Sequence, residues 1–237
     1  MTKSRDTIKA TLKAAFPNTL PVMAGYLVLG FGFGLLLNSN GYSFIWALFM
    51  SLTIYAGSMQ YVAIDLLSSG AGLITCAIMT VLINARHLFY GISMLARYRK
   101  IKKFRLYDIF ALTDETYSLV CSAEPPEGTD GDLFYFFTSA LNQCYWLLGS
   151  TAGAIFGQVV KINTTGVDFS MTALFVVIFI GNLLKRESRV PALLGLGISL
   201  LCLLLFGSSG FLIPSMIGIT AVLMLLRPVL AGKEGES

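Results

Sequence analysis

The stretch INARHLFYG, residues 83–91, places Asn84, Arg86 and His87 inside a run of otherwise apolar residues. His87 is the only histidine of the chain. Ionisable side chains are costly to insert into a membrane helix, so those found there are functional candidates by default. Whether this run lies in a membrane decides the fold class, and the surrounding sequence answers that question.

The composition predicts an all-α polytopic membrane protein. The 237 residues are 55% hydrophobic and 13% charged, with a mean hydropathy of +0.74, whereas about a quarter of a soluble domain is charged. The apolar runs are continuous, which favours membrane helices over the alternating strands of a barrel. We expect about seven apolar segments, some broken or re-entrant: 17–37, 44–67, 72–96, 132–160, 168–184, 191–206 and 211–226. A weaker segment, 108–122, is interrupted by Asp114 and Glu115.

The positive charge is explained by membrane topology. The net charge is +4, and residues 97–105 hold six of the 17 lysines and arginines. The amino terminus and residues 185–189 are also basic, and basic loops favour the cytoplasmic side. A nucleic-acid partner is therefore not needed. If every segment crossed the membrane, residues 97–105 would lie outside, so we expect 44–67 or 72–96 to be broken or re-entrant. The alternative is that 108–122 crosses and the charge rule is violated.

The chain divides into a lead-in, a transport domain and a tail. Residues 1–16 predict a cytosolic amphipathic lead-in, and residues 228–237 a cytosolic tail. The single transmembrane domain spans 17–227. Prolines and glycines in 123–132 separate it into halves of about 17–122 and 132–227. Inverted repeats are common in transporters, but the two halves show no convincing residue match.

Two adjacent segments each carry a stripe of polar residues at helical spacing. The first stripe consists of Ser51, Tyr55, Ser58 and Asp65. The second consists of Thr80, Asn84, His87 and Gly91. Gln60 lies off the first stripe, and Arg86 is turned by about 200° from Asn84 on a straight helix. A helix break at residues 84–86 would relieve this conflict and supply half-helix ends to a bound anion.

Each polar residue also has a structural interpretation. Ser51 and Thr80 suit helix packing. Arg86 either binds substrate or forms an ion pair with Asp65 or with the pair Asp114 and Glu115. His87 either carries a proton or forms neutral hydrogen bonds. The sequence does not choose among His87 and the three carboxylates as the proton carrier.

The remaining motifs favour helix packing over catalysis. Gly149, Gly153 and Gly157 have tandem G-x-x-x-G spacing, which permits close contact within the chain or with a second subunit. GFGFG (30–34) lies in an apolar segment and has the same interpretation. The four cysteines are isolated from one another. Since metal-binding, nucleotide-binding and hydrolase motifs are absent from the sequence, we expect no metal, no cofactor and no enzyme.

Four stretches in order resemble landmarks of the AzlC family, the large subunits of bacterial branched-chain amino acid exporters. They are YAGSMQYVAID (55–65), NARHLFYG (84–91), LTDETYSL (112–119) and GVDFSMTALFVVI (166–178). The resemblance covers about residues 16–227. It implies a proton-coupled exporter of leucine, isoleucine, valine and sometimes methionine in the cytoplasmic membrane, acting with a small AzlD-type membrane subunit. Met59 departs from the family, in which a small residue is frequent here.

These observations predict a secondary transporter with a polar site inside the membrane. The expected substrate-binding residues are Tyr55, Ser58, Gln60, Asn84 and Arg86. The proton-coupling candidates are His87, Asp65, Asp114 and Glu115. A channel or a non-transporting membrane scaffold is the alternative, and a membrane enzyme is a third.

Overall fold

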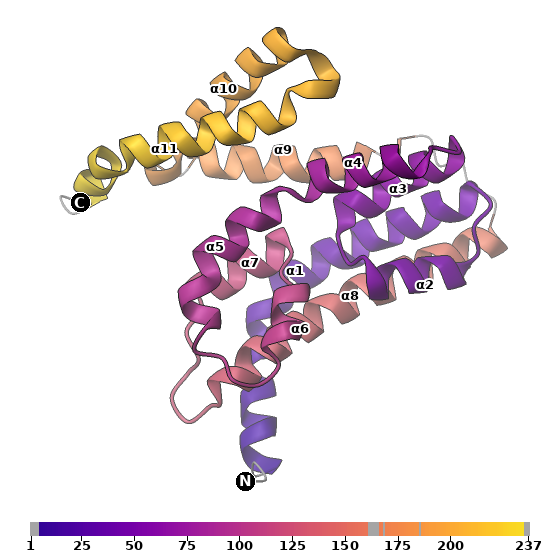
Figure 1. Ribbon diagram of the computed structural model, residues 1–237. Coiled ribbons are helices and arrows are strands. Elements are labelled where there is room, and N and C mark those ends of the chain that lie inside the picture. Colours follow the sequence, from indigo (N-terminus) through magenta and orange to yellow (C-terminus); the bar gives the residue numbers. More distant parts are fainter. Residues whose placement is uncertain (1–4, 161–165, 168, 185, 235–237) are drawn as a thin grey trace. The chain divides into compact units, whose positions relative to one another are not determined.

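The computed structural model describes residues 5–160, 166–167, 169–184 and 186–234, and these residues form helices without a strand. The helices are α1 (Arg5–Ser39), α2 (Phe44–Thr53), α3 (Gly57–Ser68), α4 (Leu73–Asn84), α5 (Arg86–Tyr98), α6 (Arg105–Phe110), α7 (Asp114–Ser122), α8 (Gly131–Val159), α9 (Phe169–Leu184), α10 (Arg186–Gly210) and α11 (Leu212–Glu234). The all-α prediction is confirmed (Figure 1).

The chain separates into two compact units, residues 1–170 and 171–237. The cytosolic lead-in, the transport domain with its two halves, and the cytosolic tail stay predictions. Part of the lead-in and of the tail lies outside the described residues. In the second unit, α10 packs against α11 and bends at Gly207, whose φ is +71°.

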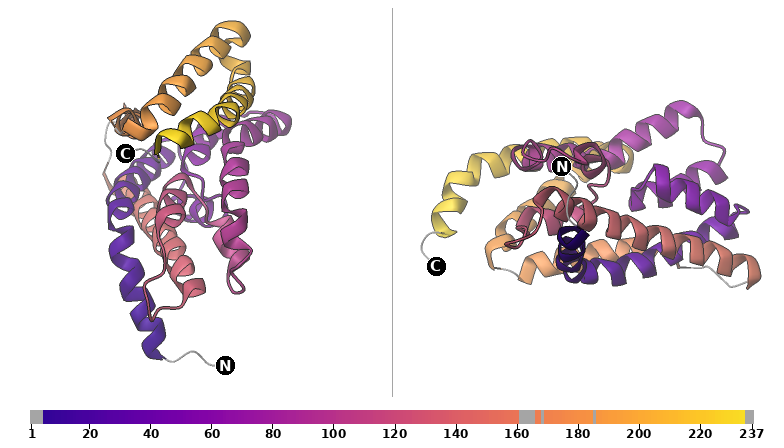
Figure 2. Two further views of the ribbon diagram at one scale, coloured as in Figure 1. Left: turned by 90° about the vertical axis from the view of Figure 1, so that its left-hand side faces the viewer. Right: turned by 90° about the horizontal axis from the view of Figure 1, so that it is seen from below.

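The long helices α1 and α8 form the centre of the first unit and lie side by side (Figures 1 and 2). Glycines permit the close approach, since a Cβ on Gly149 would lie 2.7 Å from the Leu27 carbonyl oxygen. A Cβ on Gly34 would overlap the Ser150 backbone, and one on Gly153 would overlap that of Phe31. The G-x-x-x-G contact is thus made within the chain, which was one of the two predicted alternatives.

The described residues contain two helical stretches long and apolar enough to cross a membrane, namely α1 and residues 189–208 of α10. The α4 and α5 pair would make a third span, although it is bent by 45°. The helix α8 is 29 residues long, but buried polar side chains, including Asn142 and Gln143, lower its hydropathy. Those side chains are buried against protein, so mean hydropathy underestimates how well α8 suits a membrane span.

Three of the expected segments are broken. Segment 44–67 divides into α2 and α3, and segment 72–96 divides into α4 and α5 at Ala85. The prediction that 44–67 or 72–96 is broken is therefore confirmed, and the structure breaks both segments. Segment 108–122 does not form one helix, because α6 ends at Phe110 and α7 begins at Asp114. At a rise of about 1.5 Å per residue, neither α6 nor α7 alone is long enough to span a bilayer.

Candidate functional site

The amino-terminal ends of three short helices meet at Arg86. Arg86 is the first residue of α5, and its Nη1 lies 2.7 Å from Oδ2 of Asp114, the first residue of α7. Its Nη2 donates a hydrogen bond to Ser58, the second residue of α3. Each helix start carries unpaired backbone N–H groups and a partial positive charge. The three chain breaks thus concentrate positive potential around one guanidinium.

The first break is made by an unusual backbone at Tyr55, whose φ is +42°. A non-glycine residue seldom adopts this left-handed conformation, and such residues cluster at functional sites. The helix α2 ends at Thr53 and α3 begins at Gly57, so Ser51 and Ser58 lie on different helices. The prediction of one continuous face through Ser51, Tyr55, Ser58 and Asp65 was therefore wrong.

The second break divides the other predicted stripe. Asn84 is the last residue of α4, and His87 is the second residue of α5. Thr80 and Gly91 are exposed, so the prediction that the four residues form one face was wrong. His87 is half-buried, with its Nδ1 3.1 Å from the Asn84 carbonyl oxygen.

A buried hydrogen-bond network extends from Glu115 toward α1 and α8. The Tyr26 hydroxyl on α1 donates to Glu115 Oε2 over 2.7 Å and lies 2.5 Å from Thr113 Oγ1. Asn142 Nδ2 on α8 donates to Thr116 Oγ1 over 3.0 Å. Thr113 caps α7, because its hydroxyl accepts a hydrogen bond from the Thr116 backbone N–H. The network fixes the beginning of α7 against both long helices.

Four buried polar atoms in this region have no hydrogen-bond partner among the described residues. They are the Tyr55 hydroxyl, Asn84 Oδ1, Asp114 Oδ1 and Asn142 Oδ1. An unpaired buried polar group costs about 1–3 kcal/mol, so most such groups in native proteins have a partner. Asp114 contacts Arg86 and Asn84 lies two residues before it, so these unpaired groups indicate a site for a small polar ligand.

Gln60 has a different environment from the other expected ligands. It is fully buried, and its Oε1 accepts a hydrogen bond of 2.9 Å from Trp146 on α8. Its Nε2 donates over 3.3 Å to Ser51, whose hydroxyl lies 2.8 Å from that of Ser150. Gln60 was placed off the polar face from its spacing, but the break at Tyr55 turns it toward α8. These contacts hold α2 and α3 against α8.

The structure brings together most, but not all, of the expected site residues. Arg86 contacts Ser58 and Asp114. The sequence allowed an ion pair with Asp65 or with the α7 carboxylates, and the structure shows the second. Asp65 is exposed, near the end of α3 and away from the three helix starts. In the described part of the chain, no group of three or more His, Cys, Asp or Glu residues could hold a metal ion.

Sequence reasoning missed Tyr26, Thr113 and Thr116 as parts of the site. Tyr26 lies in an apolar segment and carries no local signal. Thr113 could have been recognised as a helix cap, because it precedes the acidic pair that opens α7. Asn142 is noticeable as a polar residue in an apolar segment, but the sequence does not place it beside α7.

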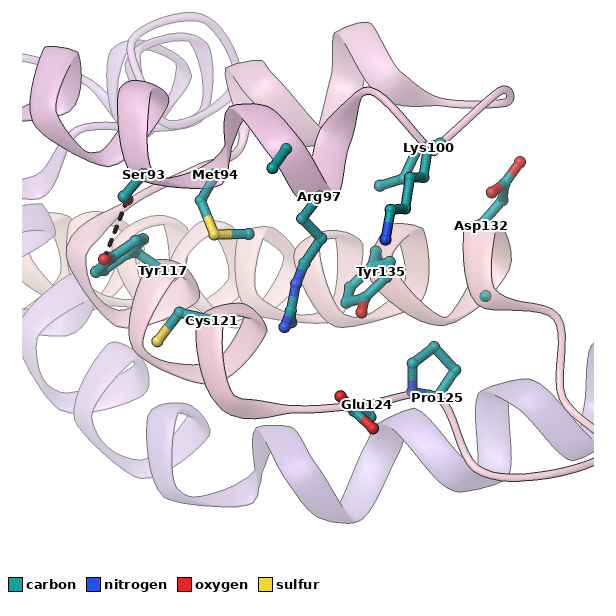
Figure 3. Close-up of a pocket in the computed structure, with 13 residues that line it drawn as sticks. Ser93, Met94, Arg97, Lys100, Tyr117, Cys121, Glu124, Pro125, Asp132 and Tyr135 are labelled. Carbon is teal, nitrogen blue, oxygen red and sulfur yellow. Dashed lines mark hydrogen bonds between the residues drawn. The ribbon is translucent and has the colours of Figure 1, made fainter. Parts of the chain in front are cut away.

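A pocket of about 580 Å³ lies between α5, α7 and the beginning of α8 (Figure 3). The Arg97 side chain extends into it between Met94 and Tyr135, and Lys100, Glu124 and Asp132 also line it. Arg97 lies 5.7 Å from the centre of the Tyr135 ring and donates hydrogen bonds to the carbonyls of Val120 and Ala123 at the end of α7. The lining therefore presents charges of both signs.

Two aromatic residues connect this pocket with the polar site. Tyr117 lines the pocket and stacks on Tyr90, with ring centres 4.7 Å apart. The Tyr90 ring lies 5.8 Å from that of His87, which follows Arg86 in α5. The stacked pair thus joins the pocket lining to a residue one turn of α5 after Arg86.

Comparisons with known proteins agree with the family resemblance. The family model described as "AzlC protein" matches residues 21–160. The branched-chain amino acid transport protein AzlC of Bacillus subtilis is 45% identical, over 97% of this chain and 91% of that protein. An uncharacterized membrane protein of Haemophilus influenzae is 43% identical, over 93% and 91%. The inner membrane protein YgaZ of Escherichia coli is 26% identical, over 76% of each chain. No solved structure matches the chain.

Proposed function

The chain belongs to the AzlC family of membrane proteins, and on that premise we propose that it is a secondary transporter that exports branched-chain amino acids. The observation that carries the proposal is the meeting of three helix starts at Arg86, near buried polar atoms that have no hydrogen-bond partner in the part of the chain that the structure describes. Discontinuous helices in transporters hold charged substrate groups in this way. The proposed location is the bacterial cytoplasmic membrane.

The substrate carboxylate binds at Arg86 and at the amino-terminal ends of α3 and α5. Arg86 already contacts Asp114 and Ser58, so the helix amides supply the additional donors. The unpaired oxygens of Asn84 and Asn142 and the Tyr55 hydroxyl hydrogen-bond the ammonium. Gln60 already has two partners and positions the backbone around Tyr55.

Glu115 is the carboxylate on which proton and substrate compete. It lies beside Asp114 at the start of α7 and accepts a hydrogen bond from Tyr26. When the ammonium binds from the cytoplasm, the Glu115 carboxyl releases its proton and forms an ion pair with the ammonium. A proton arriving from outside restores the neutral carboxyl and releases the amino acid. This competition produces antiport without ATP. His87, half-buried beside Asn84, is the candidate relay for the proton.

The pocket between α5 and α7 is the cytoplasmic access to this site. Its lining contains Arg97 and Lys100, which belong to the basic stretch expected on the cytoplasmic side. A zwitterion suits a lining with both signs of charge. To reach Arg86, the substrate passes the Tyr90 and Tyr117 pair.

The preferred side chain is aliphatic, but discrimination among aliphatic side chains is weak. One methylene in an apolar pocket is worth about 1–3 kcal/mol, so leucine, isoleucine, valine and methionine are all carried. Apolar residues of α4 such as Leu73 and Ile74 are exposed and are available to lipid or to a small AzlD-type subunit.

Counterflow in proteoliposomes tests the proposal. Vesicles loaded with unlabelled valine should accumulate radiolabelled valine, and unlabelled leucine, isoleucine and methionine should compete for its uptake. The assay is repeated with and without the co-expressed small subunit. A channel would equilibrate valine without counterflow or dependence on a pH gradient. A scaffold or an enzyme would give no flux under either condition, and that result would refute the proposal.

A further inference from the structure

Asp108 is a buried carboxyl group that lies outside the network around Arg86. It belongs to the short helix α6, is 0% exposed, and neither of its carboxylate oxygens has a hydrogen-bond partner among the described residues. The structure gives it no ion pair in that part of the chain either. A buried charge without a counter-charge is strongly unfavourable. The surroundings of Asp108 therefore favour the neutral acid or a bound cation.

Two further buried hydroxyl groups near this carboxyl also lack a hydrogen-bond partner among the described residues. The Ser139 hydroxyl on α8 is 0% exposed, and the Tyr98 hydroxyl at the end of α5 belongs to a residue that is 5% exposed. The Ser139 hydroxyl lies beside the Asp108 carboxyl, and Tyr98 lies within range of its charge. The helix α6 packs against both α5 and α8, so the three groups come together from three helices.

The charged neighbours of Asp108 do not neutralise it. Asp132 on α8 acts on it as a second negative charge, and Asp132 Oδ2 accepts hydrogen bonds from the backbone N–H groups of Lys102 and Lys103. Tyr107, the neighbour of Asp108 on α6, donates its hydroxyl to Gln143 on α8. Arg105 at the start of α6 is exposed. Among the described residues, no cation offsets the Asp108 carboxylate.

We propose that Asp108, with Ser139 and Tyr98, forms a proton-binding site that stabilises the packing of α6 against α8. The neutral carboxyl buries no charge, whereas the ionised carboxylate is favoured only by the Ser139 hydroxyl, which donates to it more strongly than to the neutral acid. The ionised form leaves a buried negative charge without a cation in the described part of the chain. Loss of the proton therefore weakens the packing of α6 against α8. The helix α6 connects α5, which carries Arg86, to α7, which carries Asp114. The protonation state of Asp108 therefore controls how α5 and α7 are held relative to each other at the transport site.

The environment of Asp108 places its titration in the physiological range. The helix α6 lies outside the candidate spans, and burial raises the pKa of Asp108 to about 7. The Ser139 hydroxyl opposes this increase and the charge of Asp132 adds to it. The neutral carboxyl, which favours the packing of α6 against α8, is thus present below about pH 7 and is lost as the pH rises through that value.

Infrared spectroscopy of the full-length protein in proteoliposomes tests the site. The wild type should show a protonated-carboxyl band that titrates near pH 7 and is absent from Asp108→Asn. Glu127→Gln, which removes an exposed carboxyl, should leave this band unchanged. Ser139→Ala should move the midpoint upward, and Asp132→Asn should move it downward. A purely structural role predicts no such opposite shifts. Equal midpoints in Ser139→Ala and Asp132→Asn would therefore overturn the proposal.

Two further measurements complete the test. Replacing choline chloride by sodium chloride should leave the midpoint unchanged, and a sodium-dependent midpoint would indicate a cation site and overturn the proposal. The link to transport rests on the proposed function and predicts that Asp108→Asn removes the change in valine counterflow centred near pH 7, while stimulation by a pH gradient through Glu115 remains. If the wild type shows the band but no valine counterflow, the proton site stands and the proposed function fails.

Discussion

The ion pair between Arg86 and Asp114 allows the structural and the transport roles of Arg86 to be separated. In Arg86→Gln the Asp114 carboxylate, whose side chain is 19% exposed, loses its counter-charge. In the double variant Arg86→Gln with Asp114→Asn no charge remains to be compensated. Arg105→Gln, at the exposed first residue of α6, is the matched control.

The magnitude follows from the burial of the pair. Removing one partner of a buried ion pair costs about 3–5 kcal/mol, and the partial exposure of both side chains, 24% and 19%, places this pair at about 3 kcal/mol. For a protein of this size about 1 kcal/mol shifts the melting temperature by about 2–4 °C. Arg86→Gln should therefore melt about 6–12 °C below the wild type. The double variant should recover most of that loss.

Thermal unfolding of the purified protein in detergent and valine counterflow in proteoliposomes form the assay. We expect both Arg86 variants to lack counterflow, and the double variant to lack it while melting near the wild type. Arg105→Gln should behave as the wild type does in both measurements. If the double variant transports valine, Arg86 has only a structural role. If Arg86→Gln melts at the wild-type temperature, the ion pair does not stabilise the fold.

Three further predictions concern Glu115, Tyr55 and Gly153. Glu115→Gln should abolish stimulation of valine transport by a pH gradient, because an amide cannot release a proton; stimulation equal to the wild type would exclude Glu115 as the carrier. Tyr55→Phe should change the melting temperature little, since the Tyr55 hydroxyl makes no hydrogen bond within the described part of the chain, and should raise the valine KM by about 2- to 10-fold. Gly153→Leu should lower the melting temperature and the folded yield, because its side chain would overlap the Phe31 backbone. Ala152→Leu, at an exposed position, is its control and should fold normally.

The sequence by itself determined the fold class and the place of one break, at residues 84–86. Composition and continuous apolar runs require membrane helices, because unpaired backbone groups are not tolerated in lipid. The conflict between the basic residues at 97–105 and a simple count of crossings predicted a broken segment. Because Arg86 and Asn84 would lie on opposite faces of a straight helix, the sequence also indicated a break between them. Both signals are local, since charge and helical period can be counted along the chain.

Only the tertiary structure decided which residues meet. The spacing of Ser51, Tyr55 and Ser58 assumes one continuous helix, whereas the left-handed backbone at Tyr55 places them on two. Arg86 could pair with Asp65 or with the α7 carboxylates by sequence, and the packing brings Asp114 to it. Tyr26 joins Glu115 across 89 residues of chain. Such contacts depend on how α1 and α8 fit together through their glycines, and helical period does not encode that fit.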